Sequence, residues 1–570
     1  MEPRREEVDV LIVGGGLAAL RAAIAASEEP GLRVGVAVKR KLGRSGSSAN
    51  TTAGYAAVLP EGGVKDVLEF PEGAAAENDS IETHYRDTME GGKWMNDPHL
   101  ARLVCEEAPA RLRELLEWGV ELKQADGHLL KTPSGDHTFA RVVGPKNSLG
   151  LDMTLALVRA AEERNVISFE NTMALELLVS GGKIAGAVCL DRSAGELVVI
   201  SAKAIVLATG GCGRLFSWTS NPVDVTGDGY VLAFHAGARL RDMEFIQFYP
   251  WRCIQPFNKT RMPIQPSTFS VGGKLFNSDG ERFMEKFDPI RKDATFRDIA
   301  ARGIYDQIRS GKVSDGGVLL DISGVSPGDF AKTNPRLNRV YVQRGQKPHD
   351  MRMIIAPEAH FFMGGVSIDE DGLSSVAGLY VAGETAGGIH GANRLNSNSL
   401  PETQVFGKRA GDSAAAYAKD KESSLLPEEA AKRWEEKISS LGGAESTGKK
   451  TLKTWRAELG DKMWRHLGIV RNDSSLREGL AYVESQLKEL DGFPLGDIKE
   501  LEAAMEIGNL LETGRLCLTA AMARKESRGA HYREDFPEQD DAEWKKSVIL
   551  NVSTSSVVEV SEISLAPAGA

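Results

Sequence analysis

The N-terminal segment constrains the fold of this chain most strongly. Val8–Val13 is a nearly continuous apolar run, which predicts a strand in the interior of a parallel sheet. It is followed by the turn Gly14-Gly-Gly-Leu-Ala-Ala19, by an alanine-rich helix to about Ser27, and by a second strand, Arg33–Val38. A G-x-G-x-x-A turn between a strand and a helix of one βαβ unit favours a site for a dinucleotide cofactor.

The end of the second predicted strand argues against NAD as this cofactor. NAD-binding units place an acidic residue there for the adenosine ribose, whereas this chain has Val38-Lys39. Some FAD proteins use other contacts at that place, so Lys39 is compatible with FAD.

A second glycine-rich segment, Gly378–Leu400, contains a short strand, a turn and the start of a helix. Its glycines allow the backbone to approach a flat ligand closely, because they have no Cβ. Glu384 is suited to hold sugar hydroxyls, and the helix that begins at Ser399 can direct N–H groups at an electron-rich group. Arg394 lies between them, so the segment predicts a cofactor site with a cation for the substrate beside it.

Two further segments have the composition of cofactor turns. Ala204–Gly211 predicts a strand that ends in a glycine turn. Thr226–Tyr230 precedes a predicted helix and places Asp228 near the N-terminus of that helix.

Composition and charge restrict the class of protein. A chain of 570 residues, 42% of them hydrophobic, is expected to form more than one domain. Its net charge of −11, with no basic stripe, argues against a nucleic-acid partner. No window approaches 18 uninterrupted apolar residues, and acidic residues follow Arg4-Arg5 in place of an apolar export signal. We therefore expect a cytoplasmic protein that reaches a membrane only through a partner.

The five cysteines are scattered through the chain without a CxxC or Cys/His cluster. No iron–sulfur, zinc or haem site is therefore expected, and no metal ligand is predicted. We expect reduced and mostly buried thiols. If the protein moves electrons, it must exchange them with a molecule outside the chain.

Changes in pattern along the chain suggest a domain division. Residues 239–352 combine short strands with several prolines and lack βα alternation, which favours a domain inserted between the cofactor-binding parts 1–238 and 353–420. Amphipathic helical periodicity predicts a helical domain over 421–540. Residues 541–570 form a C-terminal tail, which we expect to be frayed from Ser561 onwards.

Over residues 8–545 the chain resembles the flavoprotein family of succinate dehydrogenases, fumarate reductases and L-aspartate oxidases. The resemblance implies an α/β fold: a Rossmann-like FAD-binding domain, an inserted, mobile α+β capping domain and a C-terminal helical domain. Besides the two glycine-rich segments, it rests on Arg44–Gly46, Ala208–Gly211, Gly227–Gly229, Met243–Pro250, Asn277–Met284, Arg297-Asp298, His360–Val366 and Glu526–His531.

The resemblance also implies a reaction and a site. The family moves a hydride between flavin N5 and a carbon next to a carboxylate, with a proton moving at the neighbouring carbon. Arg394 and His360 match the carboxylate ligands, Arg297 matches the proton-transfer arginine, and Tyr249 stands in the capping motif that contacts the substrate. The implied FAD contacts are Gly14, Gly16, Ala19, Lys39, Ser45, Gly46, Gly54, Ala208, Asp228, Glu384, Arg394, Ser399 and Leu400.

Each of these residues also has a structural alternative. The glycines can serve turn geometry alone, and His360 can be a histidine satisfied within the core. Arg394 can form an ordinary ion pair, and Arg297 can form a salt bridge at a helix start with Asp298 or Asp293.

The flavin linkage departs from one branch of the family. Succinate dehydrogenases and membrane-linked fumarate reductases carry a histidine after Arg-Ser, bonded covalently to the flavin. This chain has Gly46 there, and no histidine occurs between residues 1 and 83. We therefore expect noncovalent FAD.

The predicted substrate pocket departs as well. The family motif Gln-Phe-His-Pro becomes Gln247-Phe-Tyr-Pro250, and Tyr249 cannot supply positive charge at neutral pH. Gln265 and Pro266 replace a Thr-Glu pair that binds the second carboxylate in dicarboxylate enzymes, and Phe269 and Val271 make the pocket more apolar. These changes predict a substrate other than a standard dicarboxylate, such as a mono-acid, a thioester or an aromatic enoate.

Three functions remain open at this point. The first is an FAD-dependent reductase or dehydrogenase subunit for electron transport, which acts on a CH–CH group of an acid or enoate and works with a separate iron–sulfur subunit. The second is a self-sufficient oxidase similar to L-aspartate oxidase. The third is a non-catalytic electron-transfer flavoprotein subunit, which the retention of Arg297, His360 and Arg394 argues against.

Overall fold

A five-stranded parallel sheet carries the cofactor turns in the computed structural model, which describes residues 3–51, 54–69, 76–134, 136–146, 149–256, 262–422, 425–442, 451–552 and 558–564. The strand order is β21-β13-β2-β3-β9, and all neighbours are parallel. The strands are β2 (Val10–Val13), β3 (Val34–Val38), β9 (Ile167–Glu170), β13 (Ala204–Leu207) and β21 (Leu379–Val381). The predicted strand–turn–helix unit is confirmed, because helix α1 (Leu17–Ser27) directly follows β2 and its turn.

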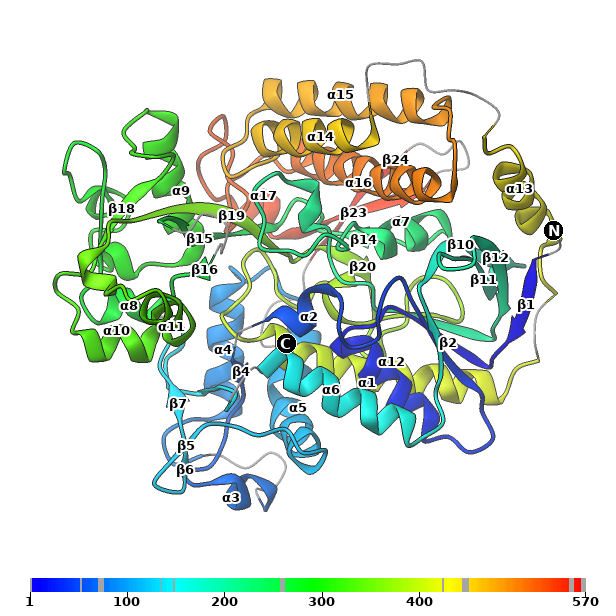
Figure 1. The fold of residues 1–570 in the computed structure, drawn as a ribbon, viewed down its shortest axis with the longest axis horizontal. Coiled ribbons are helices and arrows are strands. Elements are labelled where there is room, and N and C mark those ends of the chain that lie inside the picture. The colour runs from blue at the N-terminus through cyan, green and yellow to red at the C-terminus, as the bar shows by residue number, and fades with distance from the viewer. Residues whose placement is uncertain are drawn as a thin grey trace.

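Two helices pack closely beside this sheet. Helix α12 (Ser399–Lys419), whose predicted start is confirmed, runs along α1, as Figure 1 shows. Glycine permits this contact, since a Cβ at Gly411 would lie 2.4 Å from the carbonyl oxygen of Ala22. Helices α5 (Pro98–Glu117) and α6 (Leu149–Glu162) extend the same layer.

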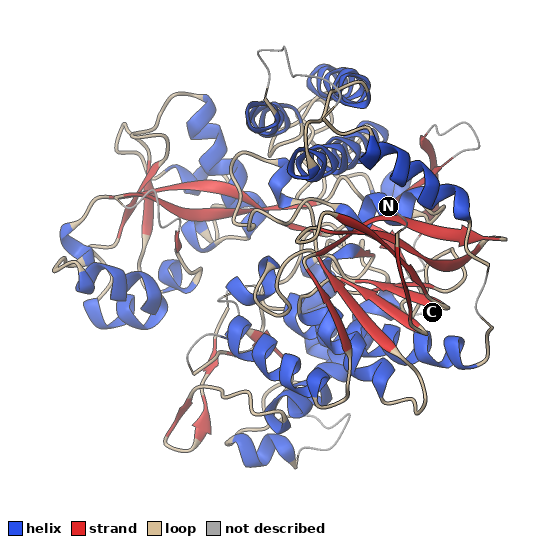
Figure 2. Cartoon of the chain, turned by 45° about the vertical axis from the view of Figure 1, so that its right-hand side comes forward, coloured by secondary structure: helices blue, strands red, loops and turns tan. Residues whose placement is uncertain are grey.

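A capping domain projects from the cofactor domain on two long antiparallel strands, β15 (Ile246–Gln255) and β19 (Met353–Phe362) (Figures 1 and 2). Its sheet has the order β16-β15-β19-β18-β17. An apolar core of its own, which includes Trp251, Phe330 and Tyr341, holds it together. Its other elements are β16 (Met262–Pro263), β17 (Lys274–Phe276), β18 (Val318–Asp321), α8 (Ser267–Ser270), α9 (Arg297–Arg309), α10 (Pro327–Thr333) and α11 (Pro335–Gln343).

Three long helices form the C-terminal helical domain, as the sequence predicts. They are α14 (Leu452–His466), α15 (Asp473–Asp491) and α16 (Ile498–Ala523), and they lie side by side at the top of Figure 1. Among the described residues, no helix is both long and apolar enough to span a membrane.

The expectation of a frayed tail from Ser561 is wrong for residues 561–564. Strands β23 (Lys546–Val552) and β24 (Val558–Ser564) form an antiparallel hairpin in register Lys546↔Ser564. The hairpin joins a sheet because β23 also pairs with β14 (Leu240–Arg241), which offers it an edge. The expectation for residues 565–570 falls outside the described residues.

The remaining elements complete the cofactor domain and its surface. A four-stranded sheet has the order β1-β12-β11-β10, with β1 (Arg4–Glu7), β10 (Thr172–Ser180), β11 (Lys183–Asp191) and β12 (Glu196–Ser201). The short helices are α2 (Gly46–Asn50), α3 (Val64–Leu68), α4 (Ile81–Gly91), α7 (Asp228–His235), α13 (Glu428–Ser439) and α17 (Asp541–Trp544). The short strands are β4 (Tyr55–Ala56), β5 (Gln124–Ala125), β6 (His128–Leu129), β7 (Lys131–Thr132), β8 (Val142–Val143), β20 (Gly365–Ser367) and β22 (Ala386–Gly387), and the 3₁₀ turns are Gly213–Leu215, Phe283–Lys286, Lys292–Ala294, Pro348–Asp350 and Gly383–Thr385.

Candidate active site

One cavity of about 620 Å³ collects most of the predicted site residues. It is bounded by the β2–α1 turn, by helix α2, by the end of β13, by the N-terminus of α12 and by the capping strands. The predicted residues that line it are Gly14, Gly16, Lys39, Ser45, Gly46, Ala208, Asp228, Tyr249, Arg297, His360, Glu384, Arg394, Ser399 and Leu400. Ala19 and Gly54 do not line it. Ala19 is fully buried within α1, and a Cβ at Gly54 would meet Val142 at 2.1 Å, so both positions serve packing.

The cofactor turns approach each other closely enough to require glycine. Gly14 has φ +131°, and a Cβ there would lie 2.2 Å from the carbonyl oxygen of Ala208 at the end of β13. A Cβ at Gly211 would lie 2.1 Å from Glu384 Oε1. The glycine positions therefore bring the ends of β2, β13 and β21 to one place, at the carboxyl edge of the sheet where nucleotide ligands bind.

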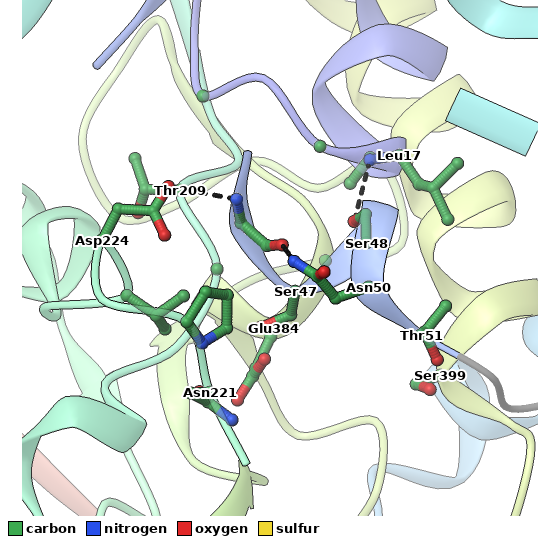
Figure 3. A pocket seen from close by; sticks show the side chains of 18 of the residues that line it. Leu17, Ser47, Ser48, Asn50, Thr51, Thr209, Asn221, Asp224, Glu384 and Ser399 are labelled. Carbon is green, nitrogen blue, oxygen red and sulfur yellow. Dashed lines mark hydrogen bonds between the residues drawn. The ribbon is translucent and has the colours of Figure 1, made fainter. Parts of the chain in front are cut away.

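Helix α2 closes another side of the cavity, as Figure 3 shows. Ser48 Oγ accepts a hydrogen bond of 3.1 Å from the backbone N–H of Leu17, at the start of α1. The backbone N–H of Gly46 donates to Asp224 Oδ2 over 3.0 Å. Residue 46, where one branch of the family carries a histidine, therefore lies on the cavity wall with a positive φ of 76°.

Lys39 finds acidic partners outside its own βαβ unit. Its Nζ lies 2.9 Å from Asp228 Oδ2 and 3.0 Å from Glu506 Oε1, and it donates to Thr226 Oγ1 over 2.8 Å. Burial opposes the charge on Lys39, but these carboxylates outweigh it and raise the pKa of the ammonium group. Glu506 belongs to α16 of the helical domain, and no motif in the sequence indicates its role.

Two arginines meet at one amide in the substrate region. Arg297 Nη1 and Arg394 Nη2 each donate to Gln247 Oε1 over 3.1 Å. The Gln247 amide is itself fixed, because its Nε2 donates to Asn393 Oδ1 at 2.8 Å and to the carbonyl oxygen of Arg394 at 2.9 Å. Two largely buried cations therefore share a neutral acceptor.

The ion pairs considered as alternatives for these arginines are not formed. Among the described residues, neither guanidinium forms a salt bridge with a carboxylate; Asp293 pairs with Arg282, and Asp298 lies 3.9 Å from Arg302. Burial, and then the charge of Arg297, lower the pKa of Arg394 to about 9. A bound carboxylate would relieve this repulsion between like charges, so the pair is suited to bind an acid.

His360 is a neutral hydrogen-bonding group in this site. Its Nδ1 lies 2.9 Å from Ser220 Oγ. Burial, followed by the charges of Arg394 and Arg297, lowers the pKa of the imidazole well below its usual value. His360 can therefore donate one hydrogen bond to a ligand but carries no charge at neutral pH.

The hydroxyl group of Tyr249 is bonded within the protein and is not free to bind a substrate. That hydroxyl donates to the carbonyl oxygen of Ile264 over 2.6 Å, so its proton is already used. The ring faces the site, with the guanidinium of Arg297 5.2 Å from its centroid and the ring of His360 at 5.3 Å. Tyr249 thus positions Arg297 and forms part of the cavity wall.

The second contact of Arg297 is also a neutral amide. Its Nη2 donates to Asn396 Oδ1, and the backbone N–H of Asn396 donates to Asp136 Oδ2 over 2.7 Å. Asn396 thus links the guanidinium of Arg297 to the carboxylate of Asp136, which does not contact Arg297 directly. Sequence reasoning missed both Asn396 and Asp136, although Asn396 lies in the glycine-rich segment that contains Arg394.

Two carboxyl groups line the cavity near the start of α12, that of the partly buried Glu384 and that of the buried Glu402. Glu384 Oε1 accepts the backbone N–H of Phe362 at 3.0 Å, and burial raises the pKa of this carboxyl to about 7. Burial, and then Glu384, raise the pKa of Glu402 to about 8. Neither oxygen of Glu402 has a hydrogen-bond partner among the described residues. Glu402 is therefore a neutral acid at pH 7, and the sequence carried no signal for it.

All five cysteines are free and buried, and the described residues contain no group of three or more His, Cys, Asp and Glu residues that could hold a metal.

The part of the cavity beside the cofactor turns fits FAD. Glycines leave the sheet edge free of side chains, and the start of α12 supplies N–H groups. Together, the fold and the cavity define an FAD-dependent oxidoreductase.

Comparisons with known proteins agree with this class. The FAD binding domain family matches residues 9–400, and the fumarate reductase flavoprotein C-terminal family matches residues 456–567. The chain is 37% identical to a fumarate reductase (CoM/CoB) subunit from Methanothermobacter marburgensis, over 97% of this chain and 98% of that protein. It is 32% identical to the chloroplastic L-aspartate oxidase of Oryza sativa subsp. japonica, over 95% of this chain and 84% of that protein.

A solved structure of a mutant FrdA of E. coli quinol fumarate reductase superposes with a TM-score of 0.88 at 26% identity, covering 99% of this chain and 97% of that chain. The chain belongs to the flavoprotein family of fumarate reductases, succinate dehydrogenases and L-aspartate oxidases, and the resemblance seen in the sequence is confirmed.

Proposed function

We propose that the protein transfers a hydride between noncovalently bound FAD and a C–C bond next to a carboxylate, as the flavoprotein component of a reductase or dehydrogenase. The observation that carries the proposal is the pair of buried guanidinium groups, Arg297 and Arg394, which meet at Gln247 in the same cavity as the cofactor turns. FAD, when bound, supplies the hydride donor or acceptor. The cation pair supplies the binding site for an acid.

Each substrate-side residue has a proposed task. Arg394 binds the carboxylate next to the reacting carbons, and His360 adds a neutral hydrogen bond. Arg297 holds the proton that moves at the neighbouring carbon, since two amide oxygens and the face of Tyr249 fix its guanidinium against the cavity. Gly46 supports a noncovalent cofactor, because no imidazole is available at that wall of the cavity.

On the cofactor side, Gly14, Gly16, Ala208, Ser399 and Leu400 are proposed to surround FAD with backbone groups. Lys39 and Asp228 are proposed to hold its polar part, and Ser45 and Glu384 to bound it from opposite walls. The proposed capping domain covers residues 239–352, which agrees with its separate core between Tyr249 and Ile355.

The central test is Arg394→Ala in the purified FAD-loaded protein. Reduction of fumarate and of acrylate by reduced viologen should fall by about 100-fold or more, because one hydrogen-bonded charge pair is lost from the bound acid. FAD content, measured in the supernatant after acid precipitation, should stay equal to that of the unchanged protein. Flavin that remains on the polypeptide would contradict the noncovalent linkage.

Arg309→Ala is the matched control, because Arg309 is a half-exposed arginine on α9 that pairs with Glu534 outside the cavity. It should leave turnover unchanged. Unchanged turnover in Arg394→Ala would overturn the proposal. Peroxide release with aspartate as the substrate would instead support an L-aspartate-oxidase activity.

We also propose that electrons reach the flavin from a separate iron–sulfur subunit. Two features support this partner: relatives in the family are named as subunits, and the described part of the chain has neither a cluster site nor an exposed cysteine. Affinity purification of the tagged protein from its native host should co-purify a chain with iron and acid-labile sulfide. A fully active single chain with its physiological donor would count against the partner.

A further inference from the structure

The cavity wall on the side of the capping sheet contains two charged residues besides Arg297, namely Glu358 and Arg336. Glu358 is neutralised, since its Oε2 lies 2.7 Å from Arg252 Nη1 and both side chains are only 2% exposed. Arg336 has no hydrogen bond or ion pair among the described residues. Among the described residues, the capping side therefore presents a second uncompensated positive charge to the cavity, in addition to that of Arg297.

The location of Arg336 is fixed through its neighbour Asn334. Asn334 Oδ1 accepts the backbone N–H of Gln265 at 2.9 Å, and its Nδ2 donates to Thr268 Oγ1 at 2.7 Å. Asn334 is only 2% exposed, so these bonds hold the start of α11 against the segment that begins at Gln265. This is the segment in which uncharged residues replace the Thr-Glu pair of dicarboxylate enzymes.

The rest of helix α11 keeps Arg336 out of the capping core. Leu337 and Tyr341, at i+1 and i+5, are buried in that core. One residue corresponds to a rotation of about 100° around a helix, so Arg336 lies beside the buried face and not on it. Its side chain is exposed and reaches the cavity together with Gln265 and Met262.

We propose that Arg336 is a specificity-determining residue that binds a second anionic group of the substrate, at the end away from Arg394. The inference rests on the proposed function, because it takes the acid held by Arg394 as its starting point. A guanidinium can bind a carboxylate through two parallel hydrogen bonds. Its charge would take over a task that Tyr249, Gln265 and Pro266 cannot perform.

Arg336 lies on the same side of the cavity as the substituted motif residues Tyr249 and Gln265. Tyr249, Gln265 and Pro266 stand in place of a His and a Thr-Glu pair, and these changes predict a substrate without a distal carboxylate. Arg336 belongs to another element, about 70 residues further along the chain, and restores positive charge to the same wall. The substrate class that fits Arg297, Arg336 and Arg394 in one cavity is an enoate or saturated acid with two anionic groups.

The test compares Arg336→Gln with the unchanged FAD-loaded protein, using fumarate as the dianionic substrate and acrylate as the mono-anionic one. We expect KM for fumarate to rise roughly 10- to 100-fold, which corresponds to the loss of a charged hydrogen-bond pair, while kcat changes little. KM for acrylate should not change. Arg336→Lys should recover part of the affinity for fumarate, because the charge returns without the bidentate geometry.

Arg339→Gln is the matched control, since Arg339 is an exposed arginine on the same helix that does not line the cavity. It should change neither KM. If Arg336→Gln leaves KM for fumarate unchanged, or raises KM for both acids equally, the role of Arg336 is overturned while turnover by the unchanged protein still supports the proposed function.

A binding measurement separates the two proposals if the unchanged protein turns over neither acid. Titration of the flavin absorbance with malonate and with acetate reports occupancy without catalysis. Weaker binding of malonate in Arg336→Gln, with acetate unaffected, would support the anion site although the proposed reaction had failed. Equal binding of malonate by the unchanged protein and by Arg336→Gln would overturn the proposed anion site.

Discussion

At the scale of single residues, Gln247 explains how two cations can lie side by side in a buried site. Its carbonyl oxygen accepts from Arg297 and Arg394, and its amide nitrogen is occupied by two acceptors, so the side chain cannot turn over. A carboxylate at this position would neutralise the arginines. A neutral amide orients them and leaves their charge for a ligand.

The neutral state of Glu402 gives a prediction about pH. The pKa of this carboxyl is raised to about 8 in the folded protein, so between pH 4.5 and 8 the folded state binds more protons than the unfolded state. Stability contributed by the protonated group is therefore present at acid pH and is lost as pH rises through about 8.

In FAD-stripped protein, Glu402→Gln should raise the free energy of unfolding at pH 8.5 relative to the unchanged chain, by on the order of 1–3 kcal/mol, and should change it little at pH 5. Urea unfolding at the two pH values measures the difference. A shift of the same size at both pH values would mean that Glu402 acts through packing alone.

At the scale of secondary-structure elements, α16 joins the helical domain to the cofactor site. Glu506 on this helix binds Lys39 at 3.0 Å and Arg456 of α14 at 2.8 Å. The βαβ unit lacks the acidic residue that usually ends its second strand, and carboxylates from α7 and α16 instead surround Lys39. The helical domain is thus part of the scaffold around the proposed adenosine side of the cavity.

Glu506→Gln should weaken FAD binding about 5- to 30-fold, because Lys39 loses a buried charged partner and its orientation. Recovery of flavin fluorescence on dilution of the loaded protein gives the dissociation constant. Glu500→Gln is the control, since Glu500 lies on the same helix and caps the N–H of Gly496. Equal effects of the two substitutions would show that α16 does not reach the cofactor through Glu506.

At the scale of the whole molecule, the sequence predicts well what depends on short stretches of chain. The β2–α1 turn, the start of α12 at Ser399 and the helical domain are confirmed, because local periodicity and glycine content determine them. The features that could not be predicted join distant segments.

Glu506 and Arg336 enter the site only through tertiary packing, and no local pattern distinguishes them from surface residues. The strand at Val558–Ser564 was missed for a similar reason. It pairs with β23, and β23 joins the sheet through β14, which lies more than 300 residues earlier in the chain.

The two strands that carry the capping domain also carry the site. Gln247 and Tyr249 lie on β15, and Glu358 and His360 lie on β19, the strand paired with it. A hinge movement of the capping domain would therefore do more than expose the site to solvent, because it would displace residues that form the site. It would pull the shared amide away from Arg394 and separate the two guanidinium groups. Release of product and disassembly of the acid site would then be the same event, because only Arg394 of the two arginines would remain at the product's carboxylate.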